Sequence, residues 1–219
     1  MGACCSQPGA ELPHASEEDI KRLREKGHLP CLAGPSSDFD GENQCQTVYI
    51  AEYENGTELT FLFLDEDRPS YCEDWLYDHI RRPLFGRWSD IESVVIIGDK
   101  MEFPGTHSGD QKWHSKVPEH GEAAVELSTF EKKDETDPII WINTWNHLLG
   151  EKNNNTEMDM TYQRPMKAGE MESMQSRDFV IRKGSRAEVD LRFKGVITTL
   201  STIITADRAE RLGKRIDLE

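Results

Sequence analysis

Short runs of apolar and β-branched residues dominate the chain from residue 47 onward. Residues 47–53 and 57–64 form two such runs, and Asn55-Gly56 lies between them. Asn-Gly is the strongest short-range hairpin signal, because both turn positions need a positive φ. Residues 93–97 are apolar except for Ser93, which favours a central strand, and 139–145 favour another. The pattern therefore predicts a sheet built around a hairpin.

Further along the chain, apolar and charged side chains alternate strictly over residues 187–194, which predicts a half-buried antiparallel strand. Residues 179–182 and 196–204 are expected to be neighbouring strands. Residues 100–121 are rich in Gly, Pro and polar side chains and predict a long loop.

Three segments have helical start signals or patterns. Ser16 to Asp19 resembles a capping box and predicts a short helix over about 16–26, which ends at Gly27. Ser70 and Glu73 form a second capping box before a helix that ends near Pro83, and a last helix is expected over about 206–216.

These elements predict an α+β fold, a single domain with a mainly antiparallel twisted sheet packed by two or three helices. Residues 27–45 are rich in turn formers and predict a linker. We therefore expect a flexible tail over 1–45 and a globular domain over 46–219. Residues 150–176 are polar, hold five of the seven methionines, and predict a mobile loop within that domain.

The first six residues, MGACCS, are the most specific motif in the chain. The pattern M-G-x-x-x-[ST] is an acceptor site for N-myristoylation of Gly2. One myristoyl chain gives only marginal membrane binding, so a second signal is needed. The first sixteen residues contain no Lys or Arg, which excludes a polybasic patch. The adjacent Cys4 and Cys5 are therefore predicted to be palmitoylated, and the segment resembles the dual-acylation tails of Src-type kinases and G-protein α subunits.

Net charge and cysteine content limit which binding partners and which cellular compartment are expected. The formal net charge of −15 repels phosphate backbones, so a nucleic-acid partner is not expected. Residues 177–219 are net basic, with 10 basic and 7 acidic side chains. They are expected to face acidic segments of the same fold or, alternatively, a membrane or an acidic partner. The five cysteines have no metal-like spacing, and the sequence shows no secretory signal and no long apolar run. These features predict a reducing, cytosolic environment. Together with the acylation motif, they predict the cytoplasmic face of the plasma membrane or an endomembrane.

One candidate for chemistry is a cluster of histidines in the predicted loop. His107, His114 and His120 fall within 14 residues, together with Asp110 and Glu119. Three imidazoles with an open position could hold a catalytic zinc ion. Their spacing fits no helix or strand face, however, so the default interpretation is a surface loop that binds no metal, and no cofactor is expected.

The stretch FLFLDED is the second candidate. An apolar strand that ends in Asp65-x-Asp67 resembles the opening motif of haloacid-dehalogenase-type phosphotransferases. The run VVIIGD, which ends in Asp99, resembles that family's later metal-binding motif. The resemblance implies a nucleophilic Asp65 and a proton-handling Asp67, whereas the preceding hairpin favours a solvated acidic turn.

The third candidate is nucleophilic catalysis. No Ser-nucleophile elbow, phosphate-binding loop or kinase motif is present in the sequence. Cys72, in the first turn of a predicted helix, has either a lowered thiol pKa or a buried and inert thiol.

Two function classes remain. The first is a non-enzymatic, doubly acylated protein of the cytoplasmic leaflet that binds a protein partner as adaptor, scaffold or regulatory module. The second is a small membrane-associated hydrolase or metal-dependent enzyme, with a site near the 100–121 loop beside Asp65, Asp67 and Asp99.

Overall fold

The computed structural model describes residues 11–34, 44–66, 71–109, 120–133, 135–154, 172–174, 180–193 and 204–216. The predicted acylation sites Gly2, Cys4 and Cys5 lie outside these ranges, as do His114 and Asp67. Most of the predicted Met-rich loop and of the strand over 196–204 also fall outside them.

The described part of the chain is mostly β. Its strands are β1 (Cys31–Gly34), β2 (Cys45–Tyr53), β3 (Gly56–Phe63), β4 (Asp90–Ile97), β5 (Lys100–His107), β6 (Gly121–Glu126), β7 (Lys132–Lys133), β8 (Asp137–Ile142), β9 (Leu149–Gly150), β10 (Glu172–Met174) and β11 (Val180–Lys183). Its helices are α1 (Glu17–Glu25), α2 (Tyr71–Phe85), α3 (Arg186–Asp190) and α4 (Ala206–Leu212), with a 3-10 turn at Leu127–Thr129.

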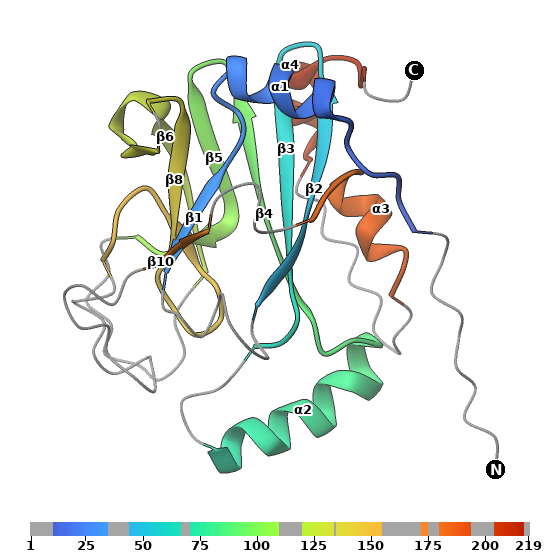
Figure 1. The fold of residues 1–219 in the computed structure, drawn as a ribbon. Coiled ribbons are helices and arrows are strands. Elements are labelled where there is room, and N and C mark those ends of the chain that lie inside the picture. The colour runs from blue at the N-terminus through green and yellow to red at the C-terminus, as the bar shows by residue number, and fades with distance from the viewer. Residues whose placement is uncertain are drawn as a thin grey trace.

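Strands from both ends of the chain join in one mixed sheet, which curls into a half-barrel (Figure 1). Its order is β10-β1-β8-β9-β5-β4-β3-β2-β11, with β6 beside β5 and β7 beside β8. The pairs β1–β8, β2–β11 and β5–β9 are parallel, and the other pairs are antiparallel. The predicted α+β class with a mainly antiparallel sheet packed by helices is therefore wrong.

The curl gives the sheet its core. Alternate residues of the strands point to one face, so that Val48 of β2, Phe61 of β3, Ile96 of β4 and Ile140 of β8 belong to one buried cluster. A flat sheet would keep β2 and β8 far apart, because four strands lie between them. On the opposite face, α3 and α4 add only small clusters, around Val189 and Leu212.

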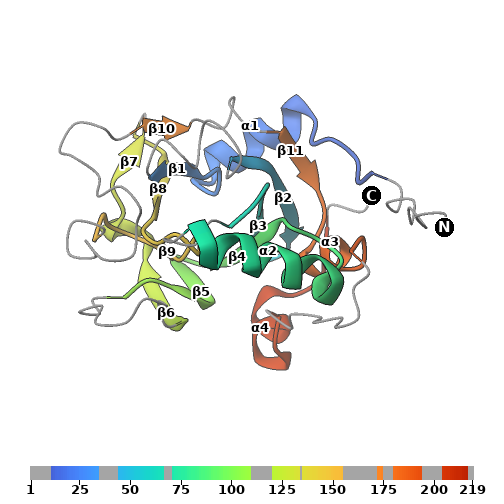
Figure 2. The same ribbon diagram turned by 90° about the horizontal axis from the view of Figure 1, so that it is seen from below.

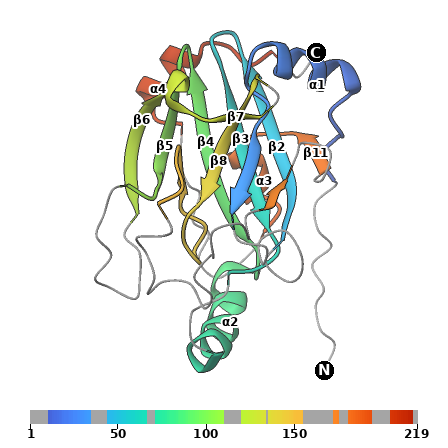
Figure 3. The same cartoon turned by 60° about the vertical axis from the view of Figure 1, so that its left-hand side comes forward.

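The longer helices lie at the two ends of the sheet and not on its face (Figure 3). Helix α1 covers one end, and α2 lies across the other end (Figure 2). Both helices were expected at these positions, and α1 begins with the predicted capping box of Ser16 and Asp19. No helix in the described ranges is both long and apolar enough to span a bilayer.

Several predicted strands are confirmed. Hairpin β2–β3 forms as expected, but its two turn residues are Glu54 and Asn55, because Gly56 already pairs with Tyr53 as the first residue of β3. Neither Asn55 nor Gly56 has the positive φ that the Asn-Gly signal predicts. Strand β4 lies between β3 and β5, as expected for a central strand. The last helix begins where predicted, at Ala206, but it ends at Leu212 because Gly213 adopts a left-handed φ of 75°.

Three local predictions are wrong. The alternating segment from residue 187 begins as helix α3, because Ser185 and Glu188 form a capping box and Arg186 pairs with Asp190 one turn later. The predicted loop over 100–121 contains strand β5. The predicted linker over 27–45 contains strand β1, which pairs with β8 and β10.

Candidate functional site

A small cavity lies at the α2 end of the half-barrel. Its volume is about 170 Å³, and it is lined by Glu66, Tyr77, Arg81, Phe85, Arg87, Asp90, Glu92, His120 and Asn146. Helix α2 supplies Tyr77, Arg81 and Phe85, which lie four residues apart and so share its inner face. Strand β4 supplies Asp90 and Glu92, which point to the same side of the sheet because they are two residues apart.

The Arg81 guanidinium joins two carboxylates at the wall of this cavity. Its Nη1 lies 2.7 Å from Glu66 Oε2 and its Nη2 lies 2.9 Å from Asp90 Oδ1. Only 4% of the surface of Arg81 is exposed. The second oxygen of Asp90 accepts a hydrogen bond of 3.1 Å from Nδ1 of the buried His147, whose ring stacks on Phe63. Helix α2 is thus joined to β4 by buried ion pairs.

The three carboxyl groups of the cavity differ in pKa. Burial and the nearby charge of Asp90 raise the pKa of Glu66 to about 7, although Arg81 opposes the shift. Burial and Asp90 also raise the pKa of Glu92 well above its usual value. Burial acts on Asp90 as well, but the hydrogen bond from His147 and the charge of Arg81 hold its pKa below the usual range. Near neutral pH the cavity therefore holds an ionised Asp90 beside two carboxyl groups that can carry protons.

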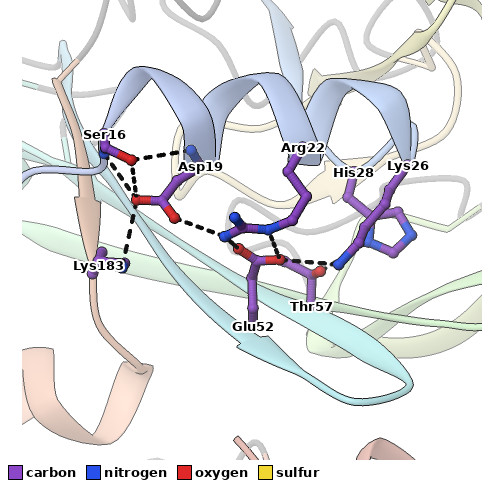
Figure 4. Close-up of polar contacts among 8 residues, drawn as sticks. All are labelled: Ser16, Asp19, Arg22, Lys26, His28, Glu52, Thr57 and Lys183. Atoms are coloured by element: carbon purple, nitrogen blue, oxygen red, sulfur yellow. Dashed lines mark hydrogen bonds and ion pairs between the residues drawn. The ribbon is translucent and has the colours of Figure 1, made fainter. Parts of the chain in front are cut away.

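The opposite end of the sheet has a second ionic network, between α1 and strands β2, β3 and β11 (Figure 4). Nε and Nη2 of Arg22 both donate to the Glu52 carboxylate, and Lys26 Nζ lies 3.0 Å from Glu52 Oε2. Asp19 accepts hydrogen bonds from Ser16 and Arg22. Burial opposes ionisation of Asp19 and Glu52, but these contacts hold the pKa of both groups below the usual range.

Asp65 and Asp99, which belong to the two motifs that resemble those of haloacid-dehalogenase-type phosphotransferases, lie far apart in the structure. Phe63 lies opposite Asp90 and Gly56 lies opposite Ile97, so β3 and β4 are antiparallel neighbours. Asp65 follows the end of β3 and Asp99 follows the far end of β4. The eight residues of β4 separate the two ends by roughly 27 Å, at about 3.4 Å per residue. Asp65 instead accepts a hydrogen bond of 2.8 Å from the backbone N–H of Glu66.

The histidine cluster is divided. His107 Nε2 lies 2.9 Å from Glu151 Oε2, while His120 lines the cavity and its Nδ1 donates to the Gly105 carbonyl at 2.8 Å. Within the described ranges, no group of three or more His, Cys, Asp or Glu side chains could hold a metal ion. Cys72 is exposed on α2, so the interpretation of a buried thiol is wrong.

The basic C-terminal residues pair within the fold. Arg208 and Arg211 both bind Glu102, and Arg215 lies 2.6 Å from Glu188. This supports the interpretation that the basic end packs beside acidic segments of the same chain.

The central residues of the cavity were missed by sequence reasoning. One signal was available, since Asp90 and Glu92 alternate with Ile91 just before a fully apolar run and therefore point to one side of a strand. No protein-family profile matches the chain, and the comparisons with curated proteins and with solved structures also find no match.

Proposed function

We propose that the protein is a doubly acylated peripheral protein of the cytoplasmic leaflet and acts there as a binding module for a protein partner. Myristate on Gly2 and palmitate on Cys4 or Cys5 would anchor the chain, and the half-barrel would carry the binding surfaces. The observation that carries the binding role is the exposed apolar face of α2, and the anchor is supported by the N-terminal motif.

Helix α2 presents its apolar side chains to solvent. Leu76 and Ile80 lie one turn apart with Trp75 beside Leu76, and their exposed fractions are 54%, 48% and 56%. Its inner face carries Tyr77 and the buried Arg81. Exposed patches of large apolar residues mark interaction surfaces in soluble domains.

The charge beside this face favours a protein over the bilayer as the occupant. Glu73 is exposed on α2 and Asp74 is next to it, and such charges are repelled by the anionic cytoplasmic leaflet. The acyl chains would therefore supply membrane attachment, and α2 would contact the partner.

The attachment of the N-terminal segment to β11 limits the distance between the anchor and the domain. The carbonyl of Leu12 accepts from Arg182, the carbonyl of Pro13 accepts from Lys183 N–H at 2.8 Å, and the Ala15 N–H donates to Ile181 at 3.0 Å. The nine residues from Gly2 to Ala10 can span at most about 30 Å. The acyl chains would thus hold β11 within that distance of the membrane.

Alkyne-myristate labelling with membrane fractionation tests the anchor. We expect Gly2→Ala to lose the label, and Cys4→Ser/Cys5→Ser to keep the label but lose membrane retention. Cys72→Ser is the matched control, because its thiol is exposed yet distant in sequence from the motif. An unlabelled wild type that stays wholly in the soluble fraction would overturn the proposal.

The binding role is tested by proximity labelling in cells, followed by reciprocal co-precipitation of the proteins found. We expect Leu76→Gln/Ile80→Gln to lose a partner that wild type captures. Leu191→Gln, at an exposed leucine beside α3, should retain it. Identical partners for all three proteins would contradict a binding role for α2.

A membrane-associated hydrolase is a second candidate function, and one observation favours it. Glu66 lines the cavity and has a pKa of about 7, which suits a general acid or base near neutral pH. A panel of ester, amide and phosphoester substrates tests it. Activity that Glu66→Gln abolishes would support the hydrolase, and no turnover of any substrate would count against it.

A further inference from the structure

The cavity at the α2 end contains an amide oxygen that lacks a partner. Asn146 is only 5% exposed, and among the described residues nothing donates a hydrogen bond to its Oδ1. The side chain lines the cavity. An unpaired buried carbonyl oxygen costs free energy unless a ligand or water donates to it.

Glu92 offers a second acceptor on the same cavity. It is 7% exposed, and none of the described side chains forms a hydrogen bond to its carboxyl group. The charged groups that face it are Asp90 on its own strand, Glu66 after β3, Arg87 after α2 and Arg186 on α3. Burial disfavours the ionised form of Glu92, and a cation in the cavity would stabilise that form.

The two guanidinium groups of the cavity are already engaged. Arg81 is held between Glu66 and Asp90, and Arg87 donates to the Ser89 carbonyl. When they are ionised, the three carboxyl groups outnumber these two cations, and the cavity then disfavours a phosphate or carboxylate ligand. Tyr77 and Phe85 add aromatic surface, which attracts a cation to the ring face.

The volume limits the ligand to a small group. A water molecule occupies about 30 Å³ of liquid volume, so a cavity of about 170 Å³ has room for only a few non-hydrogen atoms. An alkylammonium or guanidinium head group is of this size and carries the N–H donors that the free acceptors need.

We propose that this cavity binds a small organic cation, an alkylammonium or guanidinium group, which donates to Asn146 Oδ1 and to the Glu92 carboxylate and lies against Tyr77 and Phe85. This site lies on the inner face of α2, apart from the exposed face proposed for the protein partner, and so goes beyond that proposed function. The cation is either a free amine or a Lys or Arg side chain of a peptide. Binding transfers the proton of Glu92 to the buffer.

Isothermal titration calorimetry on the full chain, produced without acyl chains, tests the proposal independently of the anchor. The ligands are ethylammonium, methylguanidinium, N-acetyl-lysine amide, tetramethylammonium and inorganic phosphate. We expect the first two to bind and phosphate not to bind. Tetramethylammonium has no N–H donor, so it should bind more weakly than ethylammonium. Binding of N-acetyl-lysine amide would assign the site to a peptide side chain, and its exclusion would assign the site to a free amine.

Variants connect the binding to the two acceptors. Asn146→Ala and Glu92→Gln should each weaken binding by about 10- to 100-fold, as expected for loss of a hydrogen bond to a charged group. Asn55→Ala and Glu131→Gln are exposed matched controls and should bind like wild type. Titrations in two buffers of different ionisation enthalpy should show proton release in wild type that Glu92→Gln lacks. The proposal is overturned if no cation binds, if phosphate binds instead, or if the folded Glu92→Gln protein binds as tightly as wild type.

Discussion

Helices α1 and α2 cover opposite ends of the same half-barrel, yet they bury opposite kinds of face (Figure 3). Helix α1 turns Leu23 into the main core and leaves charged side chains such as Lys21 in solvent. Helix α2 turns Arg81 inward and leaves Leu76 and Ile80 exposed. Apolar burial therefore explains the position of α1, whereas buried ion pairs hold α2 and leave its apolar face for another molecule.

The carboxyl groups at the two ends also differ, in the direction of their pKa shifts. Around α1, the contacts of Asp19 and Glu52 outweigh burial and lower the pKa of both groups. Around α2, burial raises the pKa of Glu66 and Glu92, while Asp90 alone keeps a lowered pKa through His147 and Arg81. Buried groups with incomplete compensation reduce stability and are typical of functional sites. The α1 end therefore fits a structural role, and the α2 end fits the proposed binding role.

The largest effect is expected from Arg81→Met. Removing the guanidinium leaves Glu66 and Asp90 as uncompensated buried acids, which should lower the free energy of unfolding by about 3–5 kcal/mol. Urea unfolding followed by tryptophan fluorescence measures the change. Arg82→Met is the matched control on the exposed face of α2, and its cost should stay below about 1 kcal/mol. Equal costs for the two variants would show that α2 is not held by its ion pairs.

A leucine on each helix gives the second test of the comparison. Leu23 is 1% exposed, so Leu23→Ala should cost about 2–5 kcal/mol through lost burial and the cavity that it leaves. Leu76→Ala on α2 removes an exposed side chain and should change stability by no more than about 0.5 kcal/mol. The same unfolding assay applies. A large cost at Leu76 would mean that its side chain is buried in solution, by self-association or by the fold.

The difference between the helices also shows which structural features local sequence patterns can predict. Capping boxes and the Asn-Gly signal are local, so α1, α2 and hairpin β2–β3 were predicted near their observed positions, although the turn itself lies one residue earlier, at Glu54 and Asn55. Which face of α2 is buried depends on Glu66 and Asp90, and these residues meet Arg81 only in the folded chain. Periodicity shows that a helix has an apolar face but not where that face points.

The curl of the sheet could not be predicted for a related reason. Strand β1 joins β8, and β11 joins β2, across more than a hundred residues of sequence, and both pairs are parallel. Long-range parallel pairing leaves no local turn signal. The acids and arginines of the site fall within residues 66–92, but they were missed because the packing of α2 against the end of β4, which brings them together, leaves no local sequence signal.

The pH dependence of stability provides a third test. Glu66 has a pKa of about 7 in the folded chain against an ordinary value of 4.5, so between these values the folded state binds more protons than the unfolded state. This contribution to stability is complete below about pH 4.5 and is lost as the pH rises through 7, with a slope of at most about 1.4 kcal/mol per pH unit. Asp19 and Glu52 act in the opposite direction, because their contribution is lost as the pH falls below their ordinary values.

We therefore expect the contribution of Glu66 to stability to decline from pH 5 to pH 8, and Glu66→Gln to remove this part of the pH dependence. Urea unfolding at half-unit pH intervals measures the slope. The ion pair with Arg81, which the variant also loses, requires an ionised Glu66 and so contributes mainly above about pH 7, whereas the slope between pH 5 and pH 7 reports the titration of Glu66. A slope that the variant leaves unchanged would mean that Glu66 titrates normally.

The smallest effects are expected from two isosteric changes, one at each end. Glu52→Gln removes the charge that binds Arg22 and Lys26, both of which keep access to water, so the cost should be about 1–2 kcal/mol at pH 6. Glu92→Gln replaces a carboxyl group whose pKa is raised by burial and which pairs with no described side chain, so stability should change by less than about 1 kcal/mol. Unfolding curves at pH 6 compare the two. A larger cost at Glu92 would show an ionised and paired carboxylate there, and the two ends of the sheet would then be alike in how they hold their acids.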